Sequence, residues 1–114
     1  MPASAKIGRN VKFGKGALGV VIHEKTVIGD DVIISHNVTF GGSSKKTKGK
    51  LPVIGCRVRI GAGAVILGDV SIGSDVIIGA NSVVSVNVAD RTIVAGNPIR
   101  VLKHDINILD YVDF

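Results

Sequence analysis

The stretch IGCRVRIGAGAVILGDVSIGSDVIIGANSVVSVNV, from Ile54 to Val88, repeats its pattern every six residues. An aliphatic residue opens each hexad, and a small or β-branched residue stands four positions later. The openers are Ile54, Ile60, Ile66, Ile72, Ile78 and Val84, and the fourth positions are Val58, Ala64, Val70, Val76, Ser82 and Val88. A period of six matches neither a helix (about 3.6) nor a flat strand (about 2). It is typical of a parallel β-helix, in which three short strands and three turns form one coil.

The physical reading of the hexad is direct. The aliphatic opener and the fourth residue point into a narrow prism, and every third hexad stacks about 4.8 Å above its predecessor. The position after the opener is mostly glycine, which permits a positive φ or a close approach of two backbones. Each inward Ile or Val contributes roughly 1.5–3 kcal/mol when fully buried. The fold class is therefore all-β, a hexapeptide-repeat solenoid.

The N-terminal half carries the same pattern with two interruptions. Its openers are Ile7, Phe13, Ile22, Ile28, Ile34 and Phe40. Three extra residues fall near Gly16–Gly19, and the loop 41–52 is eight residues longer than a turn requires. Insertions in a solenoid project from one face, often the binding face. We expect one domain, 1–114, with a long lateral loop at 41–52 and a tail, 104–114, that packs on the outside of its own β-helix or of a partner.

Composition narrows the class of protein. Hydrophobic residues make up 46% of the chain and aromatic residues only 4%, which suits a prism filled by Ile, Val and Ala. No run of about 18 apolar residues predicts a membrane span, and no basic-then-apolar leader opens the chain. The single cysteine, Cys56, excludes an internal disulfide, and its turn position predicts a surface thiol. The cytoplasm is the expected compartment.

The net charge of +5 does not predict nucleic-acid binding. Much of it lies in the loop as Lys45, Lys46, Lys48 and Lys50, and no aromatic residues alternate with these lysines as single-strand binding requires. The loop lysines are either a solvated surface or a collar for a phosphorylated ligand.

Four segments of the chain resemble the hexapeptide-repeat acyltransferases, and among them the serine acetyltransferase branch and its short polysaccharide-modifying relatives. They are GVVIHEKTVIGDDVIISHNVTFGG (19–42), PVIG (52–55), IGAGAVILGDVSIGSDVIIGANSVV (60–84) and TIVAGNPIRV (92–101). The resemblance covers the chain from Ile7 to about Leu102. It implies a left-handed β-helix, a handedness that the spacing alone does not give. Serine acetyltransferases also carry an N-terminal helical domain, so this chain is not expected to be a complete serine acetyltransferase.

The resemblance further implies a homotrimer with acetyl-CoA in the groove between neighbouring chains, and no metal. The pantetheine arm would follow the backbone at Gly61, Ala62, Gly63 and Gly68, and the adenine would lie near Ala95 and Gly96. The corner Gly41–Gly42 and the lysine loop with Lys50 would border the acetyl end. A tight-turn requirement explains the same glycines without a cofactor.

The family's general base is missing from its usual places. In the serine acetyltransferase pattern an Asp-His pair stands where this chain has Lys15 and Gly16, and a second histidine stands where it has Leu51. Of the remaining histidines, His36 lies eighteen residues after Leu18 and should stack close to the Gly16 place, so it is our first candidate base. His23, beside Glu24, is the second candidate, and His104 lies in the tail.

The resemblance implies transfer of an acetyl group to a hydroxyl, less readily to an amine, on a small acceptor. With the Asp-His pair absent we favour a sugar or polysaccharide precursor over a serine-like acceptor. The alternative is a non-catalytic trimer that binds CoA or a partner protein. A zinc-dependent carbonic anhydrase on this fold would need two closely spaced histidines on one coil, whereas His23 and His36 are thirteen residues apart. An antifreeze or scaffold solenoid would show a regular outward polar ladder, and none is evident.

Overall fold

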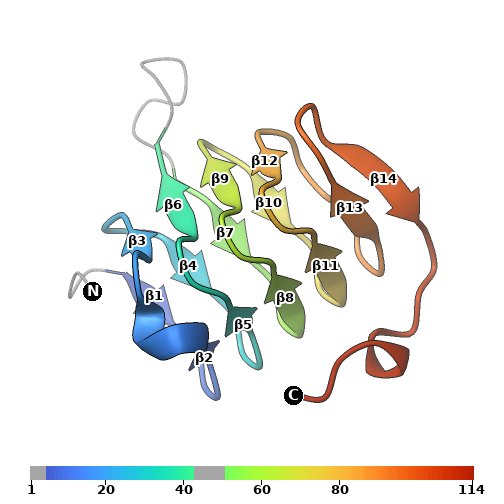
Figure 1. Cartoon of the computed structure of the whole chain (residues 1–114), viewed down its shortest axis with the longest axis horizontal. Coiled ribbons are helices and arrows are strands. Elements are labelled where there is room, and N and C mark those ends of the chain that lie inside the picture. The colour runs from blue at the N-terminus through green and yellow to red at the C-terminus, as the bar shows by residue number, and fades with distance from the viewer. Residues whose placement is uncertain (1–4, 43–50) are drawn as a thin grey trace.

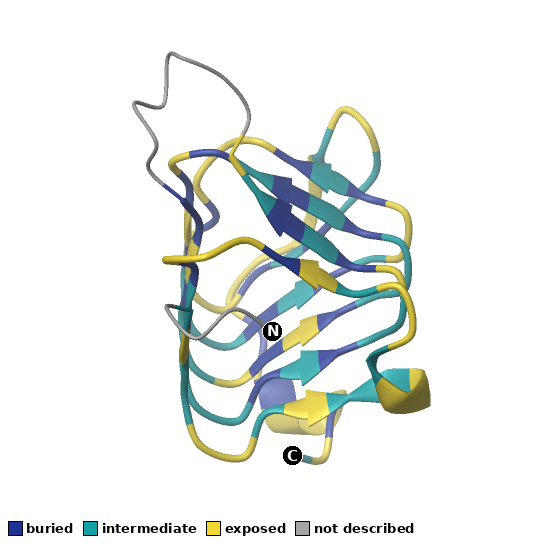
Figure 2. Cartoon of the chain, turned by 90° about the vertical axis from the view of Figure 1, so that its left-hand side faces the viewer, coloured by how far each residue is buried: buried dark blue, intermediate teal, exposed yellow. Residues whose placement is uncertain are grey.

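The computed structural model, which describes residues 5–42 and 51–114, is a left-handed parallel β-helix. Short strands follow one another around a three-sided prism and stack from one end of the molecule to the other (Figure 1). Seen from the N-terminal side, the coils enclose a shared interior of buried residues (Figure 2). This confirms the fold that the hexads predict. The loop lysines 45, 46, 48 and 50 lie outside the described residues.

Three sheets form the walls of the prism, one strand per wall in each coil. Sheet A contains β1 (Lys6–Ile7), β4 (Val27–Ile28), β7 (Val53–Ile54) and β10 (Ser71–Ile72). Sheet B contains β2 (Lys12–Phe13), β5 (Ile33–Ile34), β8 (Val58–Ile60), β11 (Val76–Ile78), β13 (Ile93–Ala95) and β14 (Arg100–Lys103). Sheet C contains β3 (Val21–Ile22), β6 (Thr39–Gly41), β9 (Val65–Leu67) and β12 (Val83–Val84). Two short 3₁₀ elements, η1 (Gly14–Ala17) and η3 (Ile108–Asp110), lie outside the walls.

The strand register locates both insertions. Val65 pairs with Val83, eighteen residues later, which is one regular coil of three hexads. Across the lateral loop the step grows to twenty-six, because Ile28 pairs with Ile54. Between Phe13 and Ile34 it is twenty-one, and the three additional residues are accommodated around η1. Both predicted insertions are therefore confirmed, and neither disturbs the inward pattern.

The hexad openers and fourth positions fill the interior. From Ile54 to Val84 every opener is at most 2% exposed, and the same holds for Ile28, Ile34 and Phe40. Among the described buried polar residues are Thr26 and Ser82, and each donates its hydroxyl to a backbone carbonyl in its own turn, at 2.7 Å in both cases. These bonds offset the cost of placing a hydroxyl in an apolar prism.

The glycines after the openers are required by close approach and not by a positive φ. A Cβ at Gly29, Gly55 or Gly61 would lie about 2.5–2.7 Å from backbone atoms or a hydroxyl of the next coil. The left-handed backbone occurs two residues later, as at Arg57 (φ 55°) and Asp75 (φ 60°). Of the two properties expected of these glycines, the structure shows the close approach, because the next coil packs against the first turn residue and the bend is made by the third.

The last coil departs from the predicted pattern. Val88 pairs with Ile72, so the step is sixteen and Val88 occupies an opener's place, not the fourth place above Val70. The turn after Val84 is two residues short. Within the segment from Arg91 to Lys103, only β13 continues the parallel wall. β14 folds back antiparallel to β13.

The tail packs on its own β-helix as a strap across the outer face of sheet B. Ile106, Ile108 and Val112 are buried against Ile33 and the neighbouring isoleucines of β11 and β13. The strap begins at Asp105, which lies 3.6 Å from Arg91, and the Ile106 N–H donates to the Arg91 carbonyl at 3.1 Å. Of the two packing surfaces that were expected for the tail, the structure shows its own helix.

We expect Ile66→Ala to lower the free energy of unfolding by about 2–5 kcal/mol, because it opens a cavity in a fully buried column. Urea denaturation followed by circular dichroism measures the change. Ser71→Ala, which alters an exposed side chain on sheet A, is the control and should change stability by less than about 0.5 kcal/mol. Equal losses in the two variants would contradict the inward assignment of Ile66.

Candidate functional site

His36 stands at the start of a column of small residues along one edge of the prism. We name this the His36 edge, formed by the turns 35–37, 61–63, 79–81 and 95–97. The Gly63 N–H donates to the His36 carbonyl at 3.1 Å, and the Asn81 N–H donates to the Ala62 carbonyl at 2.9 Å. This register places Ala62 one coil above His36, then Ala80, then Gly96. Because adjacent coils are about 4.8 Å apart, the column extends roughly 14 Å beyond the imidazole without a large side chain.

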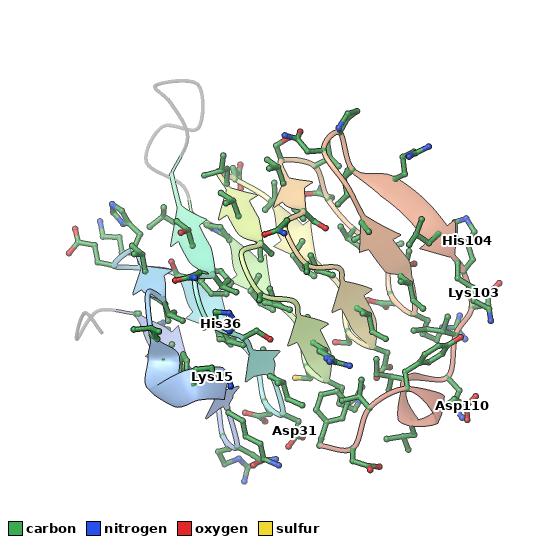
Figure 3. All side chains as sticks on the ribbon, in the orientation of Figure 1. Lys15, Asp31, His36, Lys103, His104 and Asp110 are labelled. Carbon is green, nitrogen blue, oxygen red and sulfur yellow. The ribbon has the colours of Figure 1, made fainter. Side chains whose placement is uncertain are left out.

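The half-buried His36 lies above the three-residue insertion, as its spacing from Leu18 predicts. The Asn37 N–H donates to the Leu18 carbonyl at 2.8 Å, which fixes the turn of His36 directly over η1. Figure 3 shows His36 and Lys15 on neighbouring layers at this end of the molecule. A Cβ on the exposed Gly16 would meet nothing within 4 Å. The place where the family carries its histidine is thus open here and adjacent to the His36 turn.

The remaining predicted residues lie on a second edge, which we name the His23 edge, formed by the turns at 23–26, 41–42 and 67–69. The His23 N–H donates to the Phe40 carbonyl, and the Gly68 N–H donates to the Gly41 carbonyl at 2.7 Å. His23, Gly41 and Leu67 therefore stack in consecutive coils, and Gly68 is the residue after Leu67. His23 is exposed, and its Nδ1 lies 3.0 Å from the backbone oxygen of Glu24. Gly42 is exposed beside Gly41, and Lys50 lies outside the described residues.

Sheet C separates these two edges within one chain. Its outward residues in register are Val21, Thr39, Val65 and Val83, and Val21 is 56% exposed. Nothing among the described residues covers this wall as the strap covers sheet B. The structure therefore brings His36 together with Gly61, Ala62, Gly63, Ala95 and Gly96, but it does not bring them to His23, Gly41, Gly42 and Gly68.

Coil packing by itself explains the glycines of the His36 edge. Gly63 has φ +75°, and the amide of Asn81 lies where its Cβ would be. A Cβ on Gly61 would lie 2.5 Å from the Ala80 nitrogen. These positions need glycine whether or not a ligand binds, so their identity alone does not reveal a cofactor. The informative feature is the outward small residue at Ala62, Ala80 and Gly96.

One residue of this region was not singled out from the sequence. Ala80 completes the small column, and its distance of eighteen residues from Ala62 was the signal that could have found it. Leu51, in the place of the family's second histidine, is 9% exposed, and its Cδ2 would lie 3.3 Å from a Cβ on Gly42. It packs beside the corner and has no titratable group.

Metal and membrane features are absent from the described part of the chain. Over residues 5–42 and 51–114, no three His, Cys, Asp or Glu side chains lie close enough together to hold a metal ion. No helix within these ranges is long and apolar enough to cross a bilayer. Three hollows on the described surface lie at other edges and at the C-terminal end, and His36 lines none of these three.

Comparison with known proteins identifies the lineage. A family described as "Bacterial transferase hexapeptide (six repeats)" matches residues 52–85. A serine acetyltransferase of Helicobacter pylori is 45% identical over 101 residues, which cover 89% of this chain and 58% of that relative. A serine acetyltransferase of Staphylococcus aureus is 46% identical over the same length and is covered to 47%. The chain is a hexapeptide-repeat protein related to the serine acetyltransferases.

Solved structures agree with this placement of the hexapeptide-repeat protein. Soybean serine acetyltransferase complexed with serine superposes with a TM-score of 0.81 at 46% identity, covering 87% of this chain and 40% of that one. Serine acetyltransferase from Brucella abortus in complex with coenzyme A gives 0.84 at 39% identity, with 89% and 40% covered. The chain thus spans about half the length of the curated relatives it matches, and a smaller share of these solved chains.

Gly63→Ala should destabilise the hexapeptide-repeat protein by more than about 1 kcal/mol, because the new Cβ meets both a left-handed backbone and the Asn81 amide. The combination of Gly63→Ala with Asn81→Ala should lose less than the sum of the two single losses, since the collision is then relieved while the cost of a left-handed backbone at both positions remains. Thermal unfolding of the single and double variants measures the coupling. Strictly additive losses would show that Asn81 does not dictate glycine at this position.

Proposed function

We propose that this protein transfers the acetyl group of acetyl-CoA to the hydroxyl of a small acceptor. The observation that carries the proposal is the small-residue column of the His36 edge, which ends at a half-buried imidazole. An extended thioester arm can lie against backbone only where side chains are small, and Ala62, Ala80 and Gly96 meet this condition over three coils. The relationship to serine acetyltransferases, one of them solved with coenzyme A, supports the choice of donor.

Serine is the first acceptor to test. The sequence favoured a sugar or polysaccharide precursor because the Asp-His pair is absent, but the relatives are serine acetyltransferases and one was solved with serine bound. A serine-like acceptor therefore now has the stronger support. The single cysteine, free in the structure, is compatible with the cytoplasm as the proposed compartment.

In this proposal His36 acts as the general base. The imidazole accepts the proton of the acceptor hydroxyl while that oxygen attacks the carbonyl carbon of the thioester. The carbon–sulfur bond then breaks, the acetyl ester remains on the acceptor, and the thiolate takes up the proton that His36 carries. The open space at Gly16, one layer below, leaves room for the acceptor beside the imidazole.

We further propose that the active assembly is a homotrimer. In one chain sheet C separates the His36 edge from the His23 edge, and its outward valines are uncovered in the described structure. Threefold packing of these walls can set the His36 edge of one chain against the His23 edge of its neighbour. The two groups of predicted residues, including Gly41, Gly42 and Gly68, would then share a single groove between chains.

A non-catalytic function is the second candidate, because this chain has other residues at the positions where the family carries its catalytic groups. Lys15 and Gly16 replace the Asp-His pair, and the buried Leu51 replaces the second histidine. If His36 does not act as a base, the same small column serves a non-catalytic trimer that binds CoA or a partner protein. Both functions use the His36 edge, and they differ only in turnover.

Binding of CoA should depend on the small column. We expect Ala80→Glu to weaken CoA affinity at least about tenfold in titration calorimetry, because a longer, anionic side chain would occupy the channel of an anionic ligand. Ser71→Glu places the same charge on exposed sheet A of the same coil and should leave the affinity unchanged. If CoA fails to bind the wild-type protein at millimolar concentration, the His36 edge is not a CoA site, acetyl transfer from acetyl-CoA is ruled out, and only a trimer that binds a partner protein remains.

Turnover should depend on His36 alone among the three histidines. His36→Ala should lower thiol release from acetyl-CoA in the presence of serine by about 10²–10⁴ while leaving CoA affinity nearly intact. His23→Ala and His104→Ala, which alter exposed imidazoles, are the matched controls and should retain activity. Full activity of His36→Ala would remove it as the base, and activity created only by Gly16→His would identify a chain that has lost catalysis.

A further inference from the structure

The C-terminal end of the prism is incomplete on one side. Sheet C ends at β12, and in the part of the chain that the structure describes no strand stacks above Val84. The chain leaves the wall after β13 and folds back as β14 (Figure 1). The turn that follows Val84 is also two residues short, as the pairing of Val88 with Ile72 shows. An end of a solenoid that is left uncovered in this way exposes apolar interior positions.

A bulge in β14 directs Val101 and Lys103 to opposite faces of the strand. Val101 pairs with the inward, buried Val94, whereas Lys103 pairs with Ile93 on the outer face. The extra residue between them is Leu102. Lys103 accordingly reaches the strap, where its Nζ donates to the Tyr111 hydroxyl at 3.0 Å and the pKa of Lys103 is raised, mainly by this bond. Bulges commonly re-aim a side chain in this manner.

The space enclosed there is a cavity of about 310 Å³. Its walls are mainly apolar and include Val86, Val88, Ile99 and Val101, with His104 at its margin. Val86 and Val101 are 53% and 52% exposed, so the walls do not close on one another. Figure 3 shows His104 at the end of β14 next to Lys103. Sites of this size with an apolar lining and few polar groups are typical of small-molecule binding.

The polar groups that line the cavity determine which kind of ligand group can form hydrogen bonds there. Thr92 already donates its hydroxyl to the Asp90 carbonyl, and the Asn87 side-chain oxygen accepts the Ser71 N–H at 2.8 Å. This leaves the Asn87 amide N–H groups and the His104 ring, and both can donate a hydrogen bond. No acidic residue lines the cavity. The free groups therefore match an apolar body that ends in an acceptor oxygen, best an anionic one.

We propose that this cavity binds a short-chain aliphatic carboxylate, with its chain among the valines and its carboxylate at Asn87 and His104. The site is separate from the His36 edge, because none of the turn residues 35–37, 61–63, 79–81 and 95–97 lines it. The proposal does not depend on acetyl transfer.

Titration of the full chain with hexanoate, followed by calorimetry, tests the proposal. We expect saturable binding of one hexanoate per chain, with acetate and hexanol each weaker, because each lacks one half of the recognised chemistry. Val101→Trp should abolish binding by filling the cavity. Leu102→Trp, at the neighbouring exposed bulge residue, should bind as the wild type does. His104→Ala should weaken binding roughly three- to tenfold, and His104→Gln, which restores a donor, should recover it.

Several results would overturn the proposal. Absence of saturation by hexanoate up to high millimolar concentration removes the site. Equal loss in Val101→Trp and Leu102→Trp would show a general effect on β14. Displacement of hexanoate by CoA would assign the cavity to the donor site. A change in assembly mass on Val101→Trp, measured by light scattering, would show that a second copy of the chain covers this end instead.

Discussion

The backbone ladder between successive coils is the constraint on which the rest of the structure depends. Each coil donates and accepts hydrogen bonds at a spacing of about 4.8 Å, so a residue's neighbours above and below are set by a step of eighteen and its few local exceptions. Because the coils cannot move apart, the first residue of several turns must be glycine, and the third must adopt a left-handed backbone. The side chains along each edge therefore come from residues that are stacked in space but distant in sequence.

The same ladder explains how the edges acquire different characters. At the edge formed by the turns 29–31, 55–57 and 73–75, Arg57 donates to Asp75 at 2.6 Å, and this bond is the main reason why the pKa of Arg57 is raised. Such exposed pairs contribute only about 0–1 kcal/mol each to the free energy of unfolding. Their main effect is to favour the stacking of one turn on the matching turn of the next coil. The His36 edge carries small residues instead of charges, and this contrast within one solenoid makes it the candidate channel.

The sequence predicted the features that follow from period alone. The hexads were sufficient for the three walls, the inward columns and the two insertions, and the step from Leu18 to His36 placed that histidine over η1. The position of Val88 could not be predicted, because it depends on a turn that is two residues short and still ends on a valine. The reversal at β14 occurs at a later turn, 96–99, which the hexad period does not describe. The division of the predicted cofactor residues between two edges was also hidden, since it requires the order of turns around the prism and not only their spacing.

In a single chain the two edges lie apart and the wall between them is uncovered in the described residues. Assembly of several chains would cover this wall and bring the two kinds of edge together. The strap covers the outer face of sheet B, because its isoleucines pack on the isoleucines of that wall. Sheet C, in contrast, presents Val21, Val65 and Val83, and no other described part of the chain covers them. Burial of such a wall between chains is the most direct way to protect it from water. A shared groove would then be a consequence of covering apolar surface, with catalysis placed where two edges meet.

A crystal structure of the protein grown with CoA tests this account most directly. The account predicts three chains around one axis, with the pantetheine arm lying along Ala62, Ala80 and Gly96 of one chain and its thiol end toward His36, against the His23 edge of the next chain. A CoA molecule bound on another edge, or an assembly in which sheet C remains exposed to solvent, would contradict it.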